Sequence, residues 1–94
     1  MSMNFKLITP EQLVAEGQAE MIIVPGGDGE LGFLSHHTPI LSTLKAGKIR
    51  IKQDGSYREF DVDKGFIEVF ENRVNILTHT AVSHINPQVL DSLM

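Results

Sequence analysis

The stretch that decides the fold is residues 47–62, which read GKIRIKQDGSYREFDV. Its first half alternates isoleucine with lysine or arginine, which is the period-two pattern of a half-buried β-strand. Asp54-Gly55 is a favoured type I′ turn pair, because both central residues of that turn need positive φ. With a two-residue loop, the expected facing pairs are Ile49 with Phe60 inside, and Arg50 with Glu59 and Lys48 with Asp61 outside. Apolar and charge patterns therefore predict the same hairpin register.

A second hairpin is predicted to turn at Glu71-Asn72. Its expected facing pairs are Val69 with Val74, Ile67 with Ile76, and Phe66 with Leu77. These pairs alternate between the two faces, and both faces are apolar. One face must meet the core of the domain. The other face needs a cover, so this hairpin is a candidate partner surface.

The remainder of residues 1–85 follows the same pattern of short strands. Phe5 and Leu7 share one face of a first strand, and residues 21–24 (MIIV) are apolar on both faces, which predicts a strand covered on both sides. Glycine and proline interrupt the chain so often that the segments between them are too short for ordinary helices. We therefore expect an all-β sandwich of many short strands as a single domain over residues 1–85.

Residues 86–94 depart from the strand pattern. Asn86 before Pro87 is a typical helix start, and Val89, Leu90 and Leu93 then lie on one side of a helix. The sequence predicts a short C-terminal helical tail of about two turns, which is too short to be stable alone.

Composition excludes several classes of function. The 94 residues carry twelve acids against eight bases and a formal charge of -4, which disfavours a nucleic-acid or anionic-membrane binder. Four of the bases lie in residues 45–52, but the expected pairing with Glu59 and Asp61 neutralises much of that charge. The chain has one tyrosine and no tryptophan, so no stacking platform for bases accompanies them. There is no cysteine and no apolar run of about 20 residues, and no export or import signal, so the default compartment is the cytoplasm.

Catalytic chemistry finds little support in the motifs. No serine lies in a Gly-x-Ser-x-Gly setting, and the glycine-rich residues 26–32 (GGDGELG) carry two acids that repel phosphate. That run is interpreted as a loop with positive-φ glycines joining two strands. We expect no catalytic residue, no bound cofactor and no metal.

A metal-dependent β-sandwich enzyme using Glu30, His37 and His79 remains the alternative hypothesis. Strand-borne metal sites usually take two histidines that are two residues apart, so that both point to one face. Adjacent His36 and His37 point to opposite faces of an extended strand, and so do His79 and His84, which are five apart. The simpler interpretation of His37, just before Thr38-Pro39, is that it ties a loop together through backbone hydrogen bonds.

Residues 24–41 (VPGGDGELGFLSHHTPIL) resemble the epsilon subunit of the F-type ATP synthase. The similarity continues through LKAGKIRI (44–51), KGFIEV (64–69) and VNIL (74–77), and includes the opening FKLITPE (5–11). The combination of Gly-Glu-Leu-Gly with a following His-x-Pro is what makes it specific. This sequence departs from the family at His36, where glycine is frequent, and at Lys64, where the family often has a glycine pair.

The resemblance implies a flattened β-sandwich of about ten strands in the central stalk, that is, a non-catalytic rotor subunit. In the family this domain binds the foot of the gamma shaft and sits on the polar loops of the c-subunit ring. It thereby couples proton flow to the synthesis of ATP, which takes place elsewhere in the complex. By position, Glu30 at the tip of its loop would touch the c ring, and its neighbour Leu31 would also belong to a partner interface. Thr9, His37 and Ser42 would lie on or near the face that meets gamma.

The resemblance also carries expectations about regulation and location. Family members commonly continue into an antiparallel helix pair that can brake ATP hydrolysis and that in some members binds ATP. This sequence ends at Met94, barely into the first of those helices, so we expect no helical brake and no bound nucleotide. The expected location is peripheral, on the cytoplasmic face of the bacterial inner membrane, with membrane contact only through the complex.

Overall fold

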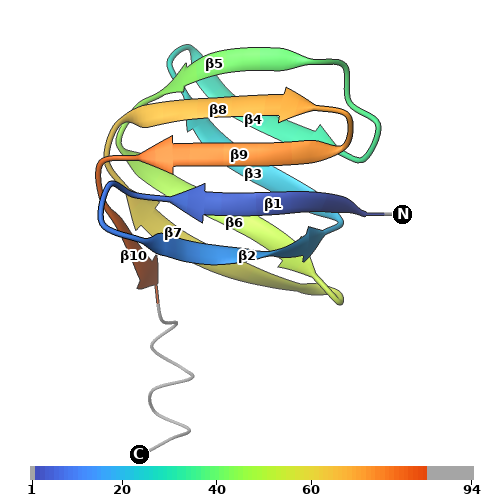
Figure 1. The fold of residues 1–94 in the computed structure, drawn as a ribbon, viewed down its shortest axis with the longest axis horizontal. Helices are drawn as coiled ribbons and strands as arrows, with labels where there is room; N and C mark the ends of the chain where they lie inside the picture. Colours follow the sequence, from blue (N-terminus) through green and yellow to red (C-terminus); the bar gives the residue numbers. More distant parts are fainter. Residues whose placement is uncertain (1, 85–94) are drawn as a thin grey trace, which may run out of the picture.

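The computed structural model describes residues 2–84, which form ten β-strands (Figure 1). The strands are β1 (Met3–Ile8), β2 (Leu13–Ala19), β3 (Met21–Gly26), β4 (Gly29–Leu34), β5 (Ile40–Leu44), β6 (Gly47–Gln53), β7 (Ser56–Val62), β8 (Gly65–Phe70), β9 (Arg73–Thr78) and β10 (Ala81–His84). This confirms the all-β prediction. The predicted helical tail over residues 86–94, and the domain limit at residue 85, lie outside the described residues.

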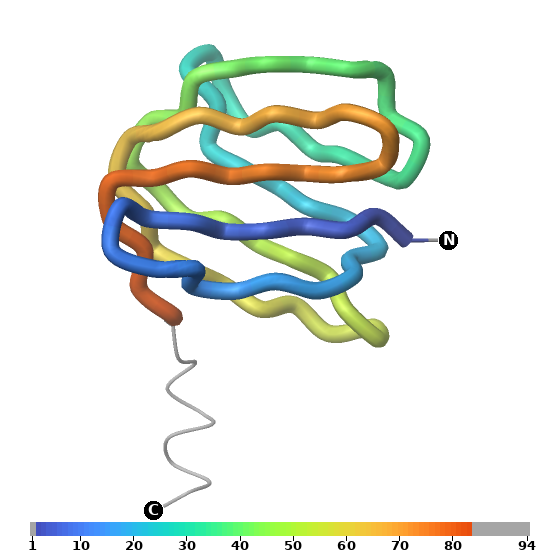
Figure 2. Tube along the Cα trace, viewed as in Figure 1, coloured from blue at the N-terminus to red at the C-terminus, as the bar shows by residue number. Residues whose placement is uncertain are grey.

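The strands lie in two layers that face each other. One layer, the front sheet, has the order β5-β8-β9-β1-β2, and the other, the back sheet, has the order β4-β3-β6-β7-β10 (Figures 1 and 2). A single cross-layer pair, Gly26 with Leu44, joins β3 to β5 at one corner. The arrangement is therefore a β-sandwich that is nearly closed into a barrel on that side.

The core fills the space between the two sheets. Its largest fully buried side chains are the three rings of Phe5, Phe33 and Phe60, which come from β1, β4 and β7. Around them pack aliphatic side chains from alternate positions of the other strands. Fully burying each of these side chains contributes about 1.5–3 kcal/mol, so the inward face of every strand is held strongly in register.

The β6–β7 hairpin has the predicted register, with Ile49 opposite Phe60. Its turn residues Asp54 and Gly55 have φ of 49° and 79°, as a type I′ turn requires. One ion pair on the outer face is diagonal across the two strands: Lys48 Nζ lies 3.9 Å from Oε2 of Glu59, the residue directly opposite Arg50. The guanidinium of Arg50 instead lies over the ring of Tyr57, 5.5 Å from its centroid.

The β8–β9 hairpin also has the predicted register, including Phe66 opposite Leu77. Its turn is of the same mirror-image kind, although neither residue is glycine: Glu71 has φ of 48° and Asn72 has φ of 62°. The β1–β2 hairpin lies beside it, because β1 pairs parallel to β9, with Phe5 opposite Val74. This parallel pairing places the first strand beside the ninth in the middle of the front sheet (Figure 2).

Two expectations about β3 and β4 need correction. Residues 26–32 are a tight hairpin rather than a loop: Gly26 pairs with Gly29 around a two-residue turn, and of this run only Gly29 has a positive φ. Strand pairing extends to Gly26 because β3 is held from both sides. The outer face of β3 is also only half covered, since Met21 and Ile23 remain partly exposed.

Gly65 lies where the backbone of β9 leaves no room for a side chain on β8. A Cβ atom at Gly65 would overlap the carbonyl oxygen of Leu77 and lie 2.8 Å from Thr78 Cα. By contrast, a Cβ at Gly32 on the exposed face of β4 would meet only Met21 Cε at 3.8 Å.

We therefore predict that Gly65→Ala lowers the free energy of unfolding by more than about 3 kcal/mol, because backbone atoms cannot yield. Gly32→Ala, the matched control, should change it by less than about 0.5 kcal/mol. Urea denaturation followed by circular dichroism measures both. Equal effects of the two substitutions would contradict the close approach.

Asn72 connects three segments at the end of the sandwich opposite Thr9. Its Nδ2 donates to the carbonyl of Ser2 (2.6 Å), and its Oδ1 accepts from the backbone N–H of His36 (2.8 Å). Its own carbonyl accepts from the N–H of Asn4 (3.0 Å). One side chain thus joins the start of β1 and the β4–β5 loop to the β8–β9 turn.

Two substitutions of Asn72 distinguish the contribution of its side-chain hydrogen bonds from the cost of its positive φ, which is 62°. Asn72→Gly loses the two side-chain bonds and should cost about 1–2 kcal/mol of unfolding free energy. Asn72→Ala must also hold alanine at positive φ, which adds about 1 kcal/mol. Thermal and urea unfolding of the two variants should rank them in that order, and an alanine variant as stable as the glycine variant would refute the backbone requirement.

Candidate partner interface

An apolar row crosses the outer face of the front sheet. Strand register places Leu13, Ile8, Leu77, Phe66 and Thr43 side by side, on β2, β1, β9, β8 and β5 in turn. Phe66 is 55% exposed, Leu13 48% and Leu77 47%. Single exposed apolar side chains are ordinary, but a row that is apolar on four neighbouring strands and ends at Thr43 on the fifth indicates a surface that another molecule covers.

Most residues of the apolar row also line a groove, which lies at the end of the sheet where β1, β5 and β9 finish and β8 begins. The groove has a volume of about 740 Å³. Its lining residues are Ile8, Thr9, Pro10, Thr43, Leu44, Lys64, Gly65, Phe66, Leu77, Thr78 and His79. Most of the lining is apolar, and Lys64 is the one lysine, arginine, aspartate or glutamate in it.

The next row along the same face is polar and limits the apolar area. It holds Glu16, Lys6, Asn75 and Glu68, with Asn75 Nδ2 donating to Glu68 Oε1 (3.4 Å). Leu41, which is 72% exposed, ends this row on β5. The apolar row is therefore bounded on one side by charge and on the other by the groove.

Thr9 and Ser42, two of the residues expected to face gamma, lie close to this surface. Thr9 lines the groove, but it is buried, and its Oγ1 donates to the carbonyl of Gln12 (3.3 Å) to close the β1–β2 turn. Ser42 on β5 is half buried on the inward face, between Ile40 and Leu44. Both hydroxyls are thus used in local hydrogen bonds, since Ser42 Oγ donates to the carbonyl of Thr43 (3.3 Å).

His37 lies at the other end of the sandwich, in the β4–β5 loop. Its ring packs edge-on against Phe33, with centroids 4.9 Å apart, and Nδ1 donates to the carbonyl of Thr38 (2.7 Å). These contacts match the interpretation of His37 as a residue that ties a loop together. Its neighbour His36 has φ of 65°, which explains why glycine suits that position.

Glu30 and Leu31 lie on β4, one and two residues beyond Gly29. Glu30 was expected at the tip of a loop, but it is a strand residue opposite Pro25, and the tip is formed by Gly27 and Asp28. Glu30 is exposed, whereas Leu31 packs partly against the core. The carboxylate therefore remains available to a partner next to the β3–β4 turn.

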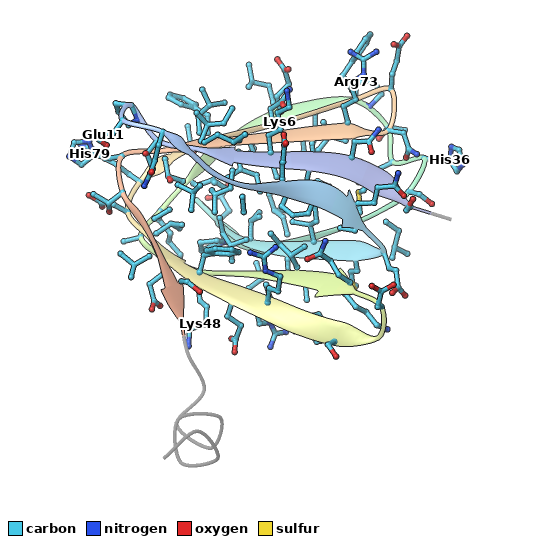
Figure 3. All side chains as sticks on the ribbon, turned by 60° about the horizontal axis from the view of Figure 1, so that its bottom comes forward. Lys6, Glu11, His36, Lys48, Arg73 and His79 are labelled. Atoms are coloured by element: carbon cyan, nitrogen blue, oxygen red, sulfur yellow. The ribbon has the colours of Figure 1, made fainter. Side chains whose placement is uncertain are left out.

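The alternative metal site is not assembled. Figure 3 shows His36 and His79 at opposite ends of the sandwich, so His37, the neighbour of His36 in sequence, is far along the molecule from His79. Within residues 2–84, no group of three or more His, Asp or Glu side chains is placed to hold a metal ion.

Phe66 and Leu77 are candidate surface residues from the sequence, because both faces of their hairpin are apolar. Ile8, Leu13 and Lys64 were not predicted, because they join this surface only through the pairing of β1 with β9 and the turn before β8. The available signal was modest: Ile8 and Leu13 are apolar positions at the ends of two adjacent strands, where a polar residue is expected.

Thr78, like Thr9, is a buried threonine that lines the groove. It is 4% exposed, and Oγ1 has no hydrogen-bond partner among the described residues. A buried hydroxyl without a partner costs about 1–3 kcal/mol. Thr78→Val should therefore raise the free energy of unfolding by about 1 kcal/mol.

Thr43→Val, on the exposed apolar row, is the matched control for Thr78→Val and should change stability by less than about 0.5 kcal/mol. Both variants are measured by urea denaturation of the isolated chain. A destabilised Thr78→Val would show that the hydroxyl is hydrogen-bonded and would refute the prediction.

Fold and surface together define a β-sandwich domain with an apolar row on its front sheet and a groove at the end of that row. The family model described as ATP synthase, Delta/Epsilon chain, beta-sandwich domain matches residues 2–84. The chain belongs to this family.

Relatives of known identity agree. The chain is 41% identical over 80 residues to the ATP synthase epsilon chain of Symbiobacterium thermophilum, covering 84% of this chain and 58% of that one. It is 40% identical over 81 residues to the chloroplastic epsilon chain of Emiliania huxleyi, covering 86% and 62%. The chain thus spans roughly three fifths of the length of these relatives.

Solved structures share the fold. A chain in the cryo-EM structure of the Euglena gracilis mitochondrial ATP synthase, OSCP/F1/c-ring, has a TM-score of 0.83 at 21% identity, covering 98% of this chain and 61% of that one. A chain in the central stalk/c-ring of the Tetrahymena thermophila enzyme has a TM-score of 0.73 at 18% identity, covering 86% and 66%. In the part of the chain that the structure describes, no apolar helix of membrane-crossing length occurs.

Proposed function

We propose that this chain is a non-catalytic rotor subunit in the central stalk of a proton-translocating F-type ATP synthase, where it joins the gamma shaft to the c-subunit ring. The observation that carries the proposal is the continuous apolar row on a domain of the delta/epsilon family. Relatives carry the epsilon-chain name, and a structural neighbour is from a central stalk/c-ring assembly.

The two partners would use different parts of the sandwich. Gamma would cover the apolar row and the nearby Thr9 and Ser42, and it would span the front sheet to reach His37. The c ring would contact the β3–β4 hairpin through Glu30 and Leu31. These assignments are supported by the exposure of Glu30 and by the position of Thr9 in the groove.

The fold suits a part that transmits torque. Backbone pairing links nine strands in one continuous path, with β4 paired to β3, so that a force on one edge is shared by the whole sandwich. A stiff wedge spreads the contact between shaft and ring, and coupling then depends on surfaces rather than on a reacting group. ATP would be made elsewhere in the complex, without a nucleotide or cofactor on this chain.

We further propose that the protein is membrane-associated through this complex, peripheral and on the cytoplasmic face of the bacterial inner membrane. The net charge of -4 supports attachment through protein partners rather than through anionic lipid.

Glu30→Lys tests the proposed function in the assembled synthase. Because Glu30 is exposed, the substitution should leave the unfolding free energy within about 0.5 kcal/mol of the unaltered protein. Proton pumping driven by ATP in membrane vesicles should fall several-fold, while ATP hydrolysis continues.

Lys52→Glu on the back sheet is the control for Glu30→Lys, and it should leave pumping intact. The unaltered chain should also co-purify with gamma from its own cells. A chain that recovers no ATP synthase subunit, or a Glu30→Lys variant with normal pumping, would contradict the assignment of partners.

A further inference from the structure

We propose that the groove docks one particular kind of gamma segment: a large apolar side chain with a carboxylate beside it. The apolar side chain enters between Phe66 and Leu77, and the carboxylate pairs with Lys64. This inference rests on the proposed function, because gamma is the partner it describes, and it adds the chemistry of the recognised segment.

The apolar half of the site is built by two facing strands. Phe66 and Leu77 are direct cross-strand neighbours, and both are about half exposed. Ile8 extends the same wall from β1. Gly65 also lines the groove, and no side chain can be added there because a Cβ would overlap the Leu77 carbonyl.

The charge of Lys64 favours a carboxylate next to the apolar side chain of the docked segment. Lys64 lies immediately before β8, beside this apolar wall, and is exposed. Its ammonium forms no ion pair among the described residues. Glu11 and Asp63 belong to the adjoining turns but not to the groove lining. Once a partner displaces water from the groove, the attraction between a carboxylate and Lys64 strengthens, because the local dielectric constant falls.

The net charge of the chain and the position of Lys64 together restrict the kind of partner that fits the groove. The chain has a formal charge of -4, which repels an acidic segment at long range, and Lys64 in the groove lining supplies the local attraction that offsets this repulsion. A second copy of this chain fits less well: a symmetric pair joined through the groove would bring two Lys64 side chains to one interface. The occupant is therefore a different chain with an acidic and apolar segment.

The test measures the dissociation constant of the 94-residue chain with purified gamma from the same synthase, at about 50 and 300 mM salt. Phe66→Ser and Lys64→Glu should each weaken binding about tenfold or more. Binding of the unaltered chain should weaken with salt, and Lys64→Glu should lose most of that salt dependence. Leu34→Ser and Lys52→Glu make the same changes on the back sheet and should remain within about twofold.

Circular dichroism and thermal unfolding check that each variant is folded, and Lys64→Gln serves as the milder variant if Lys64→Glu does not fold. A reciprocal change of one acidic residue of gamma to lysine should restore binding to Lys64→Glu. Weak binding by Phe66→Ser with unchanged binding by both Lys64 variants would overturn the proposed carboxylate. Unchanged binding by all groove variants would overturn the groove as the docking site, although the rotor function would stand. If the unaltered chain does not bind gamma at all, the proposed function itself fails.

Discussion

The parallel pairing of β1 with β9 is the constraint on which the rest of the structure depends. It joins the first strand to one of the last, with Phe5 opposite Val74, and places two hairpins side by side in the front sheet. Closing so long a loop costs chain entropy that only non-local burial can offset. The inward side chains of both strands, from Met3 to Leu7 and from Val74 to Ile76, supply that burial.

The same pairing creates the surface that we propose gamma covers. Ile8 and Leu13 come from one hairpin and Phe66 and Leu77 from another, and only the β1–β9 contact makes them one row. Because every residue of the row is carried by paired backbone, its shape is fixed before a partner arrives, and little conformational entropy is lost on binding. A sandwich with a preformed apolar face and one cation in its groove suits a subunit that works through contact.

Local chemistry was sufficient to predict the two hairpins. At Asp54-Gly55 and Glu71-Asn72, alternation and turn residues specify pairs that lie close in sequence, so both registers were predicted correctly. Pairing between hairpins is non-local, and nothing in the alternation of β1 says that Phe5 meets Val74. For the same reason the groove could not be predicted, since it depends on the ends of four strands meeting. Glu30 was misplaced because four glycines suggested a loop, whereas ladder pairing extends to Gly26 and leaves a two-residue turn.

Hydrogen–deuterium exchange of the chain, alone and bound to gamma, tests most directly whether the front sheet is the binding face. The turns that border the groove, at residues 9–12, 63–64 and 79–80, should exchange markedly more slowly in the complex. The β6–β7 turn at residues 54–55, at the opposite end, should exchange as it does in the free chain. Protection confined to β6 and β7, with the groove turns unchanged, would contradict the account.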